Sequence, residues 1–116
     1  MKWNAVLEAS ALQQARLIAT RQISSEELTR IYLERIETLD PVLQAFVRVW
    51  PKSALKSARE KDAMVASGAA LPAFHGVPMG VKDLNMVRGH ITRFGSRAVA
   101  IPAPKESLRT IPSPGP

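Results

Sequence analysis

Apolar residues recur at helical spacing in the first 40 residues of the chain and alternate with polar ones further on. The first helical window begins at Ser10, with Gln13 three residues later. This spacing is that of a capping box, in which each residue satisfies a backbone N–H of the other. It predicts a helix over residues 10–20.

A clearer helix is predicted over residues 25–39, where Ser24 and Glu27 repeat the capping-box spacing. Its apolar positions follow one another along a single stripe: Leu28, Ile31, Tyr32, Ile36 and Leu39. The pair Asp40-Pro41 is expected to end it, because the residue before a proline is disfavoured in the helical conformation.

The next segments predict alternation of strand and helix. Residues 44–50 alternate and are rich in β-favouring types, which predicts a strand. Pro51 suits the first turn of a third helix that runs to about Ser67 and stops at Gly68. A second strand is predicted over residues 76–83. The order helix, helix, strand, helix, strand indicates an α/β fold.

Lys82 is the main candidate for chemistry. In a strand, Val77, Met79 and Val81 would share one face, with Lys82 on the other. A lysine that ends a short apolar strand is a candidate for a buried, chemically tuned amine, although a lysine at a strand end commonly stays on the surface. The adjacent Asp83 would point to the opposite face and is a poor ion partner for it.

Composition limits the other functions. The net charge of +6 comes mostly from six basic residues after position 81, and these suggest a nucleic-acid-binding alternative. They are spaced apart and have only Phe94 among them for base stacking, which argues against that function: Lys82, Arg88, Arg93, Arg97, Lys105 and Arg109. The chain has no cysteine, and His90 has no partner at metal-ligand spacing, so neither a metal nor another cofactor is predicted.

The absence of a long apolar run predicts a cytoplasmic protein without a membrane partner. Five of the nine prolines lie in residues 102–116. We therefore expect one partial domain over residues 1–101, followed by a tail over 102–116 that is disordered or results from a shifted reading frame.

The segment Phe74-His75-Gly76-Val77-Pro78, followed by Val81-Lys82-Asp83 and by Thr92-Arg93-Phe94-Gly95-Ser96, resembles the first catalytic motif of the amidase signature family. Three earlier segments resemble the same family in the same order: Ile23–Leu28, Tyr32–Ile36 and Asp40-Pro41. The resemblance covers most of residues 8–101 and only the first portion of these long enzymes.

The resemblance implies an enzyme that hydrolyses small-molecule amides with two serines and a neutral lysine, for which Lys82 is the match. One serine attacks the amide carbonyl, and the lysine receives its proton through the other serine. The resemblance places both serines in a Gly/Ser-rich segment beyond this motif. It gives Ser96 and His75 a structural role, and Ser107 and Ser113 lack the flanking glycines that an oxyanion hole needs.

Three hypotheses follow from the sequence. The chain is an inactive piece of an amide hydrolase, or a module that docks on another chain, or a basic nucleic-acid-binding fragment. The first also predicts self-association through open sheet edges. A Gly/Ser-rich segment in the downstream DNA would separate the hydrolase from the other two.

Overall fold

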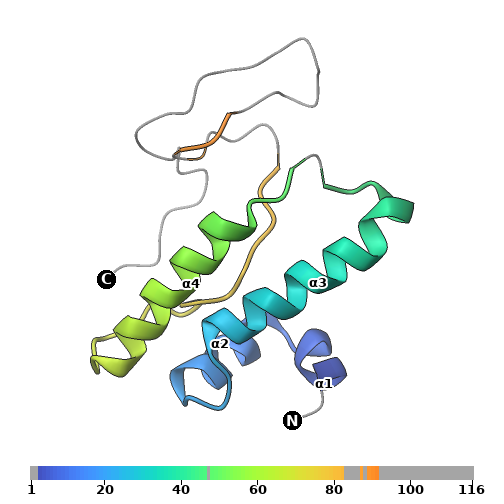
Figure 1. Cartoon of the computed structure of the whole chain (residues 1–116). Helices are drawn as coiled ribbons and strands as arrows, with labels where there is room; N and C mark the ends of the chain where they lie inside the picture. The colour runs from blue at the N-terminus through green and yellow to red at the C-terminus, as the bar shows by residue number, and fades with distance from the viewer. Residues whose placement is uncertain (1–2, 47, 83–86, 88, 92–116) are drawn as a thin grey trace. The chain divides into compact units, whose positions relative to one another are not determined.

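The computed structural model describes residues 3–46, 48–82, 87 and 89–91. The described residues form four helices, α1 (Trp3–Glu8), α2 (Ala11–Ala19), α3 (Ser25–Leu43) and α4 (Pro51–Ala66) (Figure 1). The chain divides into two compact units, and all four helices belong to the first, which holds residues 1–78. The second unit begins at Met79 and includes Lys82.

Helix α2 confirms the first capping box. The Gln13 N–H donates to Ser10 Oγ at 3.1 Å, and the Ser10 N–H donates to Gln13 Oε1 at 2.8 Å. Helix α1, which precedes it, was not predicted. Its Val6 is only 2% exposed, and the Gln14 side chain of α2 donates to the Val6 carbonyl at 2.9 Å. A buried residue of α2 therefore holds α1 in place.

Helix α3 begins as predicted, because the Glu27 N–H donates to Ser24 Oγ at 3.0 Å. The predicted end is wrong: Pro41 lies inside the helix, which continues to Leu43. Asp40 explains the end that is observed. Its carbonyl accepts the N–H of Gln44, which has a left-handed φ of 50°, and its Oδ1 accepts the N–H of Ala45 at 2.7 Å. The residue before the proline thus caps the helix one turn later.

Helix α4 begins with Pro51 at its first turn, as predicted, and its C-terminal cap is Ser67. Gly68 follows with φ +75°, the left-handed conformation that suits a residue just after a helix. The side chain of Arg21 donates to the carbonyls of Val65 and Ala66, both at 3.3 Å, and so adds a hydrogen-bond donor to the last carbonyls of α4.

The core lies where α1, α2 and the first half of α3 meet. Leu28 of α3 is fully buried, and Ile18 of α2 is 1% exposed. Partly buried residues from α2, α3, α4 and the segment after α4 pack against this cluster: Leu17, Ile31, Tyr32, Val65 and Val77. Helices α3 and α4 pack along each other (Figure 1).

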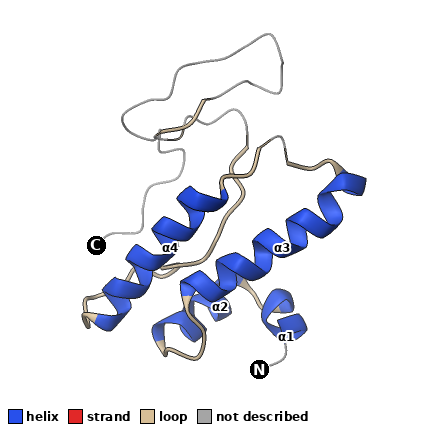
Figure 2. Cartoon of the chain, viewed as in Figure 1, coloured by secondary structure: helices blue, strands red, loops and turns tan. Residues whose placement is uncertain are grey.

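The predicted strands over 44–50 and 76–83 are wrong in the part of each that the structure describes. Residues 44–46, 48–50 and 76–82 form no strand, and Figure 2 shows them as loop. At residues 45, 46 and 77 the physical reason is that the backbone N–H groups are used locally. Residues 45 and 46 donate to Asp40, and the Val77 N–H donates to the Phe74 carbonyl in a turn. Among the described residues the fold is helical, and the α/β class is not confirmed.

Residues 47 and 83 and the proline-rich segment 102–116 lie outside the described residues. The boundary at residue 101 therefore stays a prediction. No helix in the described part of the chain is both long and apolar enough to cross a membrane.

Candidate functional site

The segment 74–78, which leads toward Lys82, is anchored to the helices by its histidine. His75 is 6% exposed, and its Nε2 lies 2.9 Å from the Lys61 carbonyl of α4. A buried imidazole with a carbonyl partner satisfies the requirement that buried polar groups be hydrogen-bonded. The structure therefore gives His75 a structural contact, in agreement with the sequence-based interpretation.

Gly76 is the second anchor, and here the fold requires glycine. Its φ is +81°, and a Cβ at this position would lie 3.1 Å from Ser25 Cβ and 3.3 Å from Ile18 Cδ1. Ser25 Oγ donates to the Gly76 carbonyl at 2.6 Å. The backbone of the segment thus lies directly against the start of α3, and a side chain here would strain the backbone and require Ser25 and Ile18 to shift by a few tenths of an ångström.

Asp62 of α4 also binds the start of α3. Its two carboxylate oxygens accept the N–H of Ser25 at 2.7 Å and the N–H of Glu26 at 3.0 Å. The N-terminus of a helix carries unpaired N–H groups and a partial positive charge, so a carboxylate is favourable there. The start of α3 therefore binds α4 through Asp62 and the segment 74–78 through Ser25.

An ion-pair cluster continues the contact between α3 and α4. Glu26 Oε1 lies 3.0 Å from Arg30 Nη2 and 3.1 Å from Arg59 Nε. Hydrogen bonds from Arg30 first, and then from Arg59, lower the pKa of Glu26 below its ordinary value of 4.5. All three side chains are partly solvated, so we assign this cluster a small contribution to stability.

Lys82, the predicted catalytic residue, belongs to the second unit and is exposed. The shared apolar face expected of Val77, Met79 and Val81 does not form. Val77 packs against the core of the first unit, whereas Met79 is 77% exposed and Val81 is 42% exposed. The described residues therefore do not bury the amine. Asp83, Ser96, Ser107 and Ser113 lie outside the described residues.

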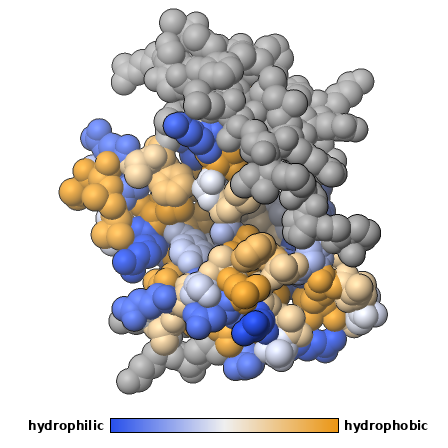
Figure 3. All heavy atoms as spheres, turned by 180° about the vertical axis from the view of Figure 1, so that it is seen from behind, coloured by the Kyte–Doolittle hydropathy of each residue, from blue (hydrophilic) through white to orange (hydrophobic). Residues whose placement is uncertain are grey.

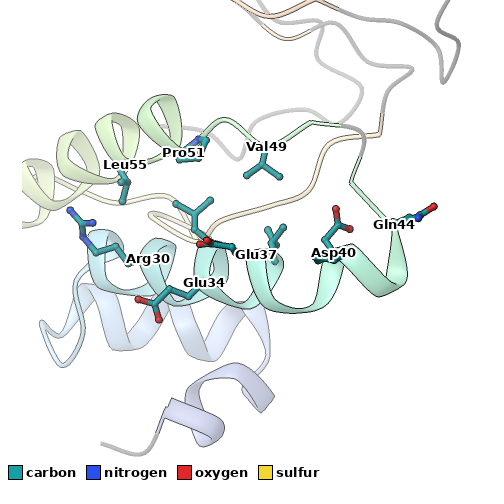
Figure 4. A pocket seen from close by; sticks show the side chains of 11 residues that line it. Arg30, Glu34, Glu37, Asp40, Gln44, Val49, Pro51 and Leu55 are labelled. Carbon is teal, nitrogen blue, oxygen red and sulfur yellow. The ribbon is translucent and has the colours of Figure 1, made fainter.

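A hollow of about 670 Å³ lies between the second half of α3 and the start of α4. Leu33 and Ile36 line it from α3. Val49 lines it from the segment before α4, and Leu55 lines it from α4 itself (Figure 4). Charged side chains of α3 stand along it, including Glu34 and Glu37. Its lining contains neither a serine nor a histidine, so it lacks the hydroxyl nucleophile by which the family attacks an amide.

Ser25 and Asp62 were missed by sequence reasoning. Their partners lie 51 and 37 residues away along the chain, and no local spacing signals such contacts. Within the described ranges, no group of three or more His, Cys, Asp or Glu side chains could hold a metal ion.

The sequence profile of a family described as Amidase matches residues 27–110. A glutamyl-tRNA(Gln) amidotransferase subunit from Acidothermus cellulolyticus is 40% identical over 92 residues, which is 79% of this chain and 18% of that protein. The protein of the same name from Myxococcus xanthus is 42% identical over 90 residues, 78% of this chain and 18% of its own length.

A solved structure has the same fold over most of the chain. It is described as a vestigial protein complex that reveals the evolutionary origins of an s-triazine catabolic enzyme. It superposes with a TM-score of 0.79 at 25% identity and covers 85% of this chain and 22% of that chain. This chain therefore spans about a fifth of the length of the relatives that it matches.

Proposed function

Since this chain belongs to the amidase family, we propose that it supplies the first catalytic segment of an amide-bond hydrolase, with Lys82 as the general base, and that it is inactive alone. The observation that carries the proposal is the place of Lys82 within the matched residues 27–110, in the segment Val81-Lys82-Asp83 that resembles the family's first motif. Its substrate would be a small-molecule amide.

The surroundings of Lys82 support inactivity of the chain alone. An amine acts as a base only in its neutral form, and burial among apolar groups favours that form. Lys82 is exposed, so the described residues do not supply such burial. The 116 residues also contain no Gly/Ser-rich segment like the one in which the family carries its two serines.

The anchored segment 74–78 supports a role in holding the motif. The contacts of His75 with α4 and of Gly76 with Ser25 fix the backbone seven and six residues before Lys82. A catalytic group must be held in a fixed position relative to the substrate, because misplacement of about 1 Å can reduce a rate about a hundredfold. This anchor belongs to the first unit alone and is complete within it.

The cytoplasmic location stays a prediction.

The test measures ammonia release from simple amides by the purified 116-residue chain. A second sample contains this chain coexpressed with the part of the Acidothermus cellulolyticus relative that lies outside the matched segment. We expect no turnover by the chain alone and turnover by the mixture. Lys82→Ala should abolish that turnover, and the matched control Lys56→Ala, on the exposed surface of α4, should retain it. Turnover by the chain alone, or turnover that survives Lys82→Ala, would overturn the proposal.

A further inference from the structure

The second half of α3 exposes the continuation of its own apolar stripe. Leu39 is 40% exposed, Leu43 is 67% exposed and Val42 is 84% exposed. These positions follow Leu28 and Tyr32 at intervals of three, four and seven residues, which places them on the same side of the helix. We call Leu39, Val42 and Leu43 the α3 end patch.

The patch is uncovered because α1 and α2 lie only against the first half of α3 (Figure 1). Leu28 belongs to the core cluster, with Ile31 and Tyr32 packed against that cluster. Beyond this cluster the stripe has no helix above it among the described residues. Hydrophobic atoms gather at the edge of the molecule where α3 ends (Figure 3). A contiguous exposed apolar patch is typical of a surface that binds another polypeptide.

The opposite side of the same helix end is also open. The hollow between α3 and α4 lies there, and its lining includes Leu33 of α3. Leu55 lines it from α4 (Figure 4). The linking segment adds Phe46 at 41% exposure and Val49 at 37% exposure. The end of α3 therefore has apolar groups on two sides. A helix with such a surface is normally covered by another layer of the fold.

We propose that the α3 end patch is the docking surface for the remainder of an amidase-family chain, meaning the part of the fold that the matched residues leave out. The relatives carry this segment as 18% of a longer protein, and a solved structure holds the same helical arrangement as 22% of its chain. In these relatives the segment is thus one part of a larger fold, and the exposed apolar side chains at the end of α3 are where we expect the next layer to pack.

The charged side chains at this end of α3 favour a protein over a nucleic acid as the occupant. Glu34 and Glu37 stand along the hollow on the opposite side of the same helix end, and they would repel a phosphate backbone that approached this end of α3. A protein surface with apolar side chains meets no such repulsion from the patch itself. The proposal concerns assembly and does not require Lys82 to be catalytic, so the test uses binding and not hydrolysis.

The experiment coexpresses the tagged 116-residue chain with the part of the Acidothermus cellulolyticus relative outside the matched segment, and measures how much of that part copurifies. Leu39→Glu should lower the copurified amount at least about tenfold, a loss of about 1.4 kcal/mol in binding free energy. The matched control is Leu12→Glu on α2, because Leu12 is 41% exposed and Leu39 is 40% exposed. We expect it to change the amount less than twofold. Circular dichroism of each variant alone should match the unsubstituted chain.

A photocrosslinker at position 42 identifies the occupant directly. With p-benzoylphenylalanine in place of Val42, the expected product has the combined mass of this chain and the coexpressed part. A product with twice the mass of this chain would assign the patch to a second copy, and an internal crosslink would assign it to this chain's own later residues. Either product would overturn the proposal, as would equal loss of binding in Leu39→Glu and Leu12→Glu or no copurification at all.

Discussion

The two halves of α3 have the same apolar pattern and opposite surroundings. In the first half, Leu28 is fully buried against α1 and α2, with Tyr32 packed on the same cluster. In the second half, Val42 and Leu43 continue the stripe and are mostly exposed. The pattern of a helix therefore tells which side is meant for burial, while the neighbouring elements decide whether burial occurs. In our proposal, the exposed half is the docking surface for the rest of an amidase-family fold.

The largest expected effect contrasts a leucine of the first half with a valine of the second. Leu28→Ala should lower the free energy of unfolding by about 2–5 kcal/mol, because it leaves a cavity in a fully buried site. Val42→Ala, at a position 84% exposed, should change it by less than about 0.5 kcal/mol. Urea unfolding followed by circular dichroism measures both. Similar losses in the two variants would show that the second half of α3 is covered in solution.

The sequence predicted those features of the fold that depend on neighbouring residues. Ser10 with Gln13, and Ser24 with Glu27, cap their helices within three residues, and Pro51 begins α4. In the part of each segment that the structure describes, the strands were predicted wrongly, because alternation shows only that a segment could be a strand. A strand also needs a partner that binds its backbone, whereas residue 45 donates to Asp40.

The candidate site was predictable in its motif and not in its anchor. Lys82 was found by its place in the segment 74–83, and its catalytic role stays a prediction. The contacts of Ser25 with Gly76 and of Asp62 with the start of α3 join residues far apart in sequence. No periodicity encodes them, so only the folded arrangement reveals that the start of α3 holds the segment before Lys82.

A second pair of variants tests how tightly the first half of α3 holds that segment. Gly76→Ala should cost about 1–2 kcal/mol for the left-handed backbone, and a further cost of about 1–3 kcal/mol for crowding against Ser25 and Ile18. The control Gly68→Ala has a similar φ, +75°, with no atom within 4 Å, and should show only the backbone cost. The two free energies of unfolding come from urea titrations. Equal losses would mean that the segment moves away from α3 at little cost.

The two ends of α3 provide a third comparison. Asp62→Ala removes a carboxylate that accepts two N–H groups at the partly buried start of the helix. We expect a loss of about 1–2 kcal/mol, in the upper part of the range for helix caps. Asp40→Ala removes a carboxylate that accepts the N–H groups of Ala45 and Phe46, which are exposed and can bind water instead. The free energy of unfolding, from urea titrations, should therefore fall less in Asp40→Ala than in Asp62→Ala. A larger fall in Asp40→Ala would show that the C-terminal cap of α3 contributes more to stability than its N-terminal contact with Asp62.

The smallest expected effect is a pH dependence from Glu26 in the first half of α3. Hydrogen bonds from Arg30 and then Arg59 lower the pKa of Glu26 in the folded chain, so the folded state binds a proton less readily than the unfolded state. The stabilisation is present above the unfolded value, near 4.5, and is lost as the pH falls through the lower folded value. NMR titration of the Glu26 carboxyl carbon should give a pKa below 4.5 that rises toward it in Arg30→Gln and, to a smaller extent, in Arg59→Gln. Salt should weaken the shift, because these side chains are exposed to solvent. An unchanged Glu26 titration in both arginine variants would show that α3 and α4 do not hold this ion-pair cluster in solution.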